Sequence, residues 1–202
     1  MGVGKTALAE RVAIRLDATA VLEDNDNPFL SDFYQEKPGS AFQTQLFFLL
    51  SRHRQQTSLQ QTDLFSHMTI CDYLFEKDRI YAYLSLDDNE LFIYQKVYEL
   101  LARDIPQPDL VVYLQAPTEW LVRRAKERAR RPEHEGPALD AGYIKELNEA
   151  YQHFFFHYTA TPLLVVETSQ VDLSSDEESV DDLIHQIKVM GKGTQYYVPR
   201  AR

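Results

Sequence analysis

The sequence predicts an α/β protein built on a mostly parallel sheet with helices on both faces. Three observations predict this class. Short apolar segments alternate with amphipathic segments along the chain, which is the order found in parallel-sheet proteins. A glycine-rich turn at residues 2–6 opens the first amphipathic segment. Polar side chains close three apolar segments, at Glu23, Asp72 and Gln115, and ligands bind at the carboxyl ends of parallel strands.

The first half of the chain predicts two of these strands. Leu8, Val12 and Leu16 recur at four-residue steps, which predicts an amphipathic helix beginning near Lys5. Proline at position 28 fits the first position of a helix or turn. The segments that follow the first helix are a strand over 18–23, a helix or turn over 27–35, a long apolar helix over 40–56, a strand over 68–72, and helices over 73–84 and 88–103.

The second half holds the clearest buried strand, a continuous apolar run over 109–115 bounded by Pro108 and Pro117. The other expected segments are a helix over 118–131, a loop over 132–137, a helix over 140–158, the last strand over 162–166, and an acidic segment over 174–182 before a helix ending near Met190. We expect residues 1–190 to form one domain and residues 191–202 to form a surface or partner-bound tail.

The composition excludes several classes of protein. A chain of 202 residues can bury a full core. Its 21 basic and 31 acidic residues give a net charge of −10, which disfavours a general nucleic-acid binder. The single cysteine, Cys71, excludes an internal disulfide and suits a reducing compartment. No apolar run approaches the roughly 18 residues needed to span a bilayer, and no signal peptide is recognisable. We therefore expect a cytoplasmic protein without nucleic-acid or membrane partners.

The turn GVGKT at residues 2–6 is typical of a phosphate-binding loop. Its backbone N–H groups and the helix N-terminus would hold phosphate oxygens, Lys5 would reach the terminal phosphates, and the Thr6 hydroxyl would bind Mg²⁺. The complete pattern has a further glycine and a preceding strand, which would fall before Met1. We expect this central first strand to be encoded upstream, by about ten residues, and we expect the chain as given to be poorly stable and weakly active.

A basic cluster occupies residues 123–131, where six of nine residues are cationic. Arg124, Arg128 and Arg131 share one helical face. One interpretation is a solvated face with Glu127 as an ion-pair partner. The other is a closing lid whose arginines neutralise a transferring phosphoryl group. The lid interpretation is favoured because the cluster follows the strongest strand and precedes a loop of proline and glycine.

Two strand-end acids and two polar residues of an apolar helix are further candidates. A kinase that acts on a hydroxyl needs a carboxylate for the proton and oxygen ligands for Mg²⁺, and Glu23 or Asp72 would supply them. Either one alone is more often an ordinary strand-end acid. Gln45 and Arg52 lie seven residues apart on one helix face. Burial would require partners for them, which base edges or salt bridges would supply; Asp78 is a natural partner for Arg52.

The ordered set of motifs resembles the deoxynucleoside kinase family, in the bacterial branch of its deoxyadenosine, deoxyguanosine and deoxycytidine kinases. The matching motifs are GVGKT, VLED followed by NPFL, FYQEKP, AFQTQLFFLLSR, CDYLFEKDRIYA, DLVVYLQAP and the arginine-rich lid. The resemblance implies a P-loop kinase fold with a lid at about residues 128–138. It implies ATP-dependent phosphorylation of a deoxynucleoside 5′-hydroxyl with Mg²⁺, and a homodimer formed through the helices over 40–56 and 88–103.

The resemblance also implies a role for each matching residue. Catalysis falls to Glu23, as the base for the 5′-hydroxyl proton, with Lys5, Arg124 and Arg128. The ATP-binding residues are Gly2, Val3, Gly4, Lys5, Thr6, Arg128 and Arg130. The substrate-binding residues are Tyr34 and Glu133 at the sugar 3′-hydroxyl, Gln45, Phe48 and Tyr81 at the base, and Arg52 with Asp78 as the pair that senses base substituents. The Mg²⁺ ligands are Thr6 and Asp72.

One motif departs from the family. The E/D-R-S motif reads Asp72-Tyr73-Leu74, so it lacks the arginine that normally helps to hold the base carboxylate and the phosphates. Arg79 is the candidate substitute. Two other functions stay open. A nucleoside monophosphate kinase, such as a thymidylate kinase, is disfavoured because Glu23 would repel an acceptor phosphate. A catalytically weak nucleotide-binding regulatory subunit is favoured by the half phosphate loop and the tyrosine. The pocket residues are compatible with adenine, guanine or cytosine.

Overall fold

The computed structural model describes residues 3–24, 26–62, 68–130, 140–171, 173 and 176–199. Helices and strands alternate along these ranges, as the sequence predicts. The elements in chain order are α1 (Lys5–Leu16), β1 (Thr19–Val21), α2 (Leu30–Tyr34), α3 (Ser40–Thr62), β2 (Thr69–Cys71), η1 (Phe75–Lys77), α4 (Asp78–Ser85), α5 (Asp88–Leu101), η2 (Ala102–Asp104), β3 (Val111–Gln115), α6 (Thr118–Ala129), α7 (Ala141–Phe156), β4 (Leu163–Glu167), α8 (Glu177–Val189) and β5 (Thr194–Tyr197).

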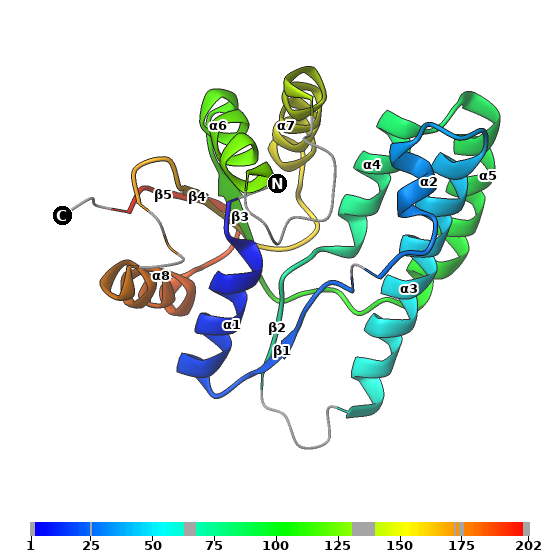
Figure 1. The fold of residues 1–202 in the computed structure, drawn as a ribbon. Coiled ribbons are helices and arrows are strands. Elements are labelled where there is room, and N and C mark those ends of the chain that lie inside the picture. The colour runs from blue at the N-terminus through cyan, green and yellow to red at the C-terminus, as the bar shows by residue number, and fades with distance from the viewer. Residues whose placement is uncertain are drawn as a thin grey trace.

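The described strands form two parallel sheets (Figure 1). In the smaller sheet β1 pairs with β2, and Val21 lies opposite Cys71. In the larger sheet the order is β3-β4-β5. The carboxyl ends of β1 and β2 lie together because the two strands run in parallel, so the residues that follow them meet at one edge.

Alternate side chains of β3 and β4 enter two different cores, because successive residues of a strand point to opposite faces. On one face, residues of α1 and α8 pack with Val112, Leu114, Leu164 and Val166. On the other face, the end of α7 packs with Val111, Tyr113, Leu163 and Val165. The larger sheet is therefore covered by helices on both faces, and α1 is fixed by the packing of its apolar side.

Helices α2, α3, α4 and α5 gather on the side of β1 and β2 opposite α8 (Figure 1). Helices α3, α4 and α5 share a core that contains Leu49 of α3, Ala82 of α4, and Tyr94 and Tyr98 of α5. Helix α5 begins with a capping box, in which the Asp87 carboxylate accepts from the backbone of residues 89 and 90. This helical layer carries most of the residues that the sequence assigns to the substrate.

Three predicted boundaries are wrong. The strand over 162–166 is not the last, because β5 pairs in parallel with β4 inside the predicted tail. Most β5 side chains are exposed, so no apolar run indicates the strand. Helix α3 continues to Thr62, and the predicted helix over 73–84 divides into the short η1 turn and α4. The predicted loop over 132–137 and most of the lid lie outside the described residues. Within the described ranges, no helix has the length and apolar character needed to cross a membrane.

Candidate active site

The N-terminus of α1 carries the lysine and threonine of the predicted phosphate loop. Gly4 caps the helix with φ of 79°, a left-handed conformation that suits glycine. Among the described residues no side chain caps this terminus, and the first turn contains no acid. Its backbone N–H groups therefore favour an anion. Val3 packs against a small apolar cluster that includes Leu121 of α6 and Ile144 of α7, whereas Gly2 lies outside the described residues.

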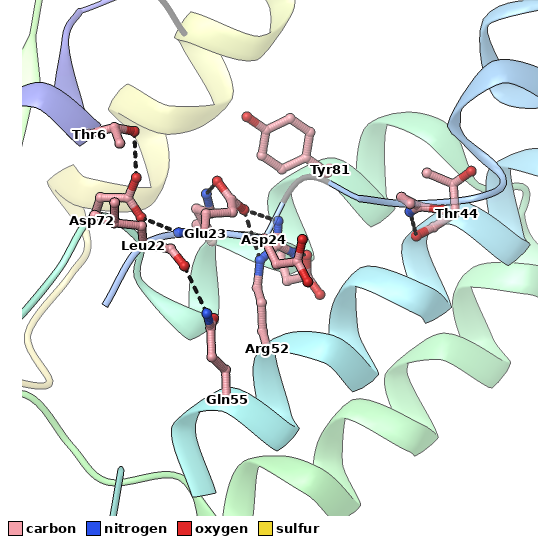
Figure 2. A network of polar contacts seen from close by, with 12 residues as sticks. Thr6, Leu22, Glu23, Asp24, Thr44, Arg52, Gln55, Asp72 and Tyr81 are labelled. Carbon is pink, nitrogen blue, oxygen red and sulfur yellow. Dashed lines mark hydrogen bonds and ion pairs between the residues drawn. The ribbon is translucent and has the colours of Figure 1, made fainter. Parts of the chain in front are cut away.

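Asp72 joins this helix end to Glu23 (Figure 2). The Thr6 hydroxyl donates to Asp72 Oδ2 at 2.5 Å, and the Glu23 backbone N–H donates to Asp72 Oδ1 at 2.7 Å. Asp72 follows β2 and Glu23 lies two residues beyond β1, so the parallel pairing of these strands brings the two acids together. Thr6 at the start of α1 and the backbone of the predicted base Glu23 therefore bind the same carboxylate.

Two cations from different elements hold the Glu23 carboxylate. Arg52 of α3 donates to Glu23 Oε1 from both Nε, at 3.0 Å, and Nη2. Lys77 donates from Nζ to Glu23 Oε2 at 2.8 Å. Burial disfavours the ionised form of Glu23, but Lys77 and Arg52 outweigh this effect and lower its pKa to about 2. Glu23 is therefore an ionised, firmly held carboxylate at neutral pH.

The predicted ion pair between Arg52 and Asp78 is confirmed. Asp78 is fully buried and Arg52 nearly so, and the Arg52 guanidinium also lies 4.9 Å from the centre of the Phe48 ring. One guanidinium thus contacts both Asp78 and Glu23, and Figure 2 shows Arg52 beside Glu23. Because arginine presents several donors in a rigid plane, this contact fixes the two carboxylates relative to each other.

Lys5 lies in the same charged environment. Burial lowers its pKa, while the charges of Glu23 and Asp72 raise it and that of Arg128 lowers it further. Arg128 also acts on the hydroxyl of Tyr34, whose pKa is raised by burial. The charge of Arg128 on α6 thus acts on Lys5 at the start of α1 and on Tyr34 of α2, and the lid interpretation stays a prediction.

The other predicted lid residues lie elsewhere or outside the described ranges. The Arg124 guanidinium stacks on Trp120 at 5.1 Å and lines a cavity of about 320 Å³ between α6 and residues 168–171. Arg130 is exposed at the C-terminal end of α6. Arg131 and Glu133 are outside the described residues.

The predicted base-binding residues lie on α3 and α4. Gln45 is 4% exposed. Tyr81 accepts a hydrogen bond from the Tyr151 hydroxyl at 3.3 Å and lies close enough to Glu23 for the carboxylate charge to raise its pKa, although burial has the larger effect. Tyr34 of α2 is 40% exposed. The described side chains assigned to the deoxynucleoside thus come from α2, α3 and α4, and Tyr81 among them is coupled electrostatically to Glu23.

Sequence reasoning selected the wrong cation to replace the missing motif arginine. Arg79 is exposed and lies over the Tyr98 ring at 5.3 Å. Lys77, which the sequence reading did not single out, pairs with Glu23 instead. Two further contacts were also missed: Gln55 Nε2 donates to the Leu22 carbonyl at 2.8 Å, and the Tyr151 hydroxyl donates to that of Tyr81. The only sequence signal that could have pointed to Lys77 was its position a few residues after Asp72 and Tyr73.

The oxygen atoms of Thr6 and Asp72 fit a magnesium ion. A hydroxyl and a carboxylate already lie within hydrogen-bonding distance, and Mg²⁺ prefers such oxygen ligands while keeping waters and substrate phosphates. Among the described residues, no group of three His, Cys, Asp or Glu side chains could hold a metal. A magnesium ion here would therefore depend on phosphate oxygens for much of its coordination.

Comparisons with known proteins agree with one another. A family model described as deoxynucleoside kinase matches residues 1–190. The deoxyadenosine/deoxycytidine kinase of Bacillus subtilis (strain 168) is 26% identical over 195 residues, covering 93% of this chain and 88% of that protein. The deoxyguanosine kinase of the same organism is 30% identical over 154 residues, covering 75% and 73%.

Solved structures match the fold. Deoxyadenosine kinase from M. mycoides with bound dATP gives a TM-score of 0.72 at 22% identity, covering 93% of this chain and 94% of that one. The structure of that kinase with dCMP and a flexible dCDP bound gives a TM-score of 0.70. The similarity supports an α/β architecture of parallel sheets flanked by helices.

Proposed function

The chain belongs to the deoxynucleoside kinase family, and on that premise we propose that it transfers the γ-phosphoryl group of ATP to the 5′-hydroxyl of a deoxynucleoside. The products are ADP and the deoxynucleoside monophosphate. Members of this family are phosphotransferases, and phosphoryl transfer depends mainly on positioning and charge stabilisation. The described site offers both, because it combines a helix N-terminus, several cations and a buried carboxylate.

The contacts of Asp72 carry this proposal. Through Asp72, the Thr6 hydroxyl and the Glu23 backbone are joined by two hydrogen bonds of 2.5 and 2.7 Å. This arrangement supports a phosphate donor at the start of α1 and an acceptor hydroxyl beside the Glu23 carboxylate. If the two groups faced different spaces, in-line transfer between their ligands would be impossible.

We assign the donor side to the phosphate loop and the lid. Gly4, Lys5 and the N-terminal N–H groups of α1 bind the ATP phosphates. Arg128, which lies on α6, neutralises the charge of these phosphates. Mg²⁺, held by Thr6 and Asp72, supplies charge neutralisation when bound. Arg124 and Arg130 keep their predicted assignment to ATP and its phosphates.

We assign the acceptor side to the α2, α3 and α4 layer. Tyr34 holds the sugar, and Gln45 reads an edge of the base from its buried position on α3. Phe48 and Tyr81 border the base, while Arg52 and Asp78 sense its substituents. Glu23 orients the 5′-hydroxyl and accepts its proton.

The test is an assay of ADP release by the purified chain with ATP, Mg²⁺ and each of the four deoxynucleosides. We expect turnover with at least one deoxynucleoside, and a loss of 100-fold or more in Glu23→Gln, a conservative estimate for one acid–base group. Glu146→Gln, which changes an exposed glutamate on α7, is the matched control. Turnover only with deoxynucleoside monophosphates would instead establish a monophosphate kinase. Binding of ATP without any turnover would instead indicate a regulatory subunit.

We also propose a homodimer formed through the α3 and α5 layer. Phe92, Ile93 and Leu100 of α5 are 61%, 51% and 61% exposed, and Leu50 of α3 is 48% exposed. Large exposed apolar side chains on neighbouring helices favour a protein interface. Light scattering should give twice the chain mass for the unmodified protein and a monomer mass for Phe92→Lys. A monomer mass for both would contradict the proposed dimer.

A further inference from the structure

Lys77 occupies an unusual position for a lysine. It ends the short η1 turn, and its backbone N–H donates to the Leu74 carbonyl at 3.2 Å. The side chain is only 6% exposed, although Arg79, two residues later, is exposed. Lysine is seldom buried without a partner, since a desolvated ammonium is costly. The tight turn therefore directs a cation into the protein interior at this point.

The partner of this cation is Glu23. The distance from Lys77 Nζ to Glu23 Oε2 is 2.8 Å, and the ammonium also lies 5.9 Å from the centre of the Tyr73 ring, where cation–π attraction operates. Burial lowers the pKa of Lys77 to about 8, and the Glu23 charge only partly offsets this effect. Lys77 is therefore still mostly protonated at neutral pH and binds Glu23 as an ion pair.

The two carboxylate oxygens of Glu23 have different partners. Arg52 contacts Oε1, whereas Lys77 contacts Oε2. The terminal torsion of a glutamate is broad, so contacts to one oxygen leave the carboxylate plane weakly defined. A second cation on the other oxygen fixes that plane. Productive transfer requires reacting groups to be aligned closely, and a misplacement of about 1 Å lowers the rate about 100-fold.

We propose that Lys77 is a positioning residue for phosphoryl transfer, which fixes the orientation of the Glu23 carboxylate toward the acceptor hydroxyl. The inference rests on the proposed function, because it gives Lys77 a role only through Glu23. Tyr73 contributes by placing its ring beneath the ammonium. Lys77, supported by Tyr73, thus brings a cation to Glu23 from the turn after β2. Arg79 lies over the Tyr98 ring and does not supply this cation.

The test is a double-mutant cycle, because a positioning residue and its target lose their effects together. Lys77→Met should lower kcat at least tenfold, while the Kd values for ATP and the deoxynucleoside change less than threefold. Lys77→Arg, which keeps the charge, should recover at least a third of the kcat. In the Glu23→Gln background, Lys77→Met should change kcat less than twofold. Lys96→Met, which removes an exposed lysine of α5, is the matched control.

Each other outcome overturns the inference. A kcat for Lys77→Met within threefold of the unmodified protein would show that Arg52 alone orients Glu23. An equal tenfold loss in the Glu23→Gln background would show that Lys77 acts through general stability. If Lys77→Met does not fold by circular dichroism, Lys77→Gln replaces it in the same cycle with the same thresholds. Absence of turnover by the unmodified chain overturns the proposed function and the inference together, whereas normal turnover with an insensitive Lys77 overturns the inference alone.

Discussion

Replacing Arg52 with methionine tests the buried charge network most directly. Arg52 contacts Glu23 and Asp78 while only 7% of its side chain is exposed, and Asp78 is fully buried. Asp78 Oδ2 has no hydrogen-bond partner among the described residues, so loss of Arg52 leaves this carboxylate without its ion pair. Removing one partner of a buried pair typically lowers the free energy of unfolding by about 3–5 kcal/mol.

We expect a loss of that size in Arg52→Met, measured by urea denaturation. For a domain of this length each kcal/mol shifts Tm by about 2–4 °C, so Tm should fall by roughly 6–20 °C. Lys37→Met is the control, since its pair with Asp32 is 52% and 44% exposed, and exposed pairs contribute about 0–1 kcal/mol.

A second substitution separates lost charge balance from lost packing. Arg52→Met combined with Asp78→Leu should recover most of the stability, because a buried ion pair replaced by apolar groups is often neutral. A loss in Arg52→Met no larger than in Lys37→Met would refute the buried network. A double variant less stable than Arg52→Met would refute the assignment of the loss to the stranded carboxylate.

Three other predictions concern the base, a helix end and pH. Gln45→Ala should weaken deoxynucleoside binding about 10–100-fold, as expected for the loss of two hydrogen bonds of about 1 kcal/mol each. ATP binding should not change. If calorimetry shows that the binding of deoxynucleoside and of ATP weakens equally, the base-reading role is contradicted. Asp87→Ala should lower the free energy of unfolding by about 1 kcal/mol by removing the α5 cap, and an unchanged urea midpoint would contradict this expectation. The pKa of Lys77 lies below its ordinary value, at about 8, so the protonated form prevails only below that pH. The kcat of the unmodified protein should therefore fall as pH rises from 7 to 9, whereas the kcat of Lys77→Arg should stay constant over this range. A flat pH profile for both proteins would contradict the expectation.

The sequence predicted the elements that have an apolar face. The α1 helix and the β3 strand are examples. Leu8 and Val12 of α1 pack in the core on one face of the larger sheet, and the apolar run over 111–115 pairs with β4. It missed β5, whose pairing with β4 depends on backbone hydrogen bonds rather than side-chain burial. It also ended α3 too early, since glutamines continue a helix through favourable propensity after the apolar pattern ends.

The site could be predicted where a residue follows directly from strand order. Glu23 and Asp72 were found because parallel strands end at one edge. Lys77 was missed for a geometric reason. In a continuous helix over 73–84 Lys77 and Arg79 would lie on opposite sides, and the sequence alone did not show which side is buried; in the structure Lys77 is buried at the end of the 3₁₀ turn over 75–77 and Arg79 is exposed. Side-chain direction at such a turn depends on tertiary packing rather than on local spacing.

The low pKa of Glu23 constrains the proposed transfer. Burial alone would raise this pKa, yet Lys77 and Arg52 lower it to about 2, so the carboxylate attracts a proton weakly. An alcohol does not lose its proton to such a group before attack. Phosphoryl transfer passes through a loose transition state in most analyses, which needs little prior activation of the nucleophile. The hydroxyl proton therefore leaves late, after bonding to phosphorus has made the oxygen acidic, and until then the two cations make Glu23 an orienting group first and a base second.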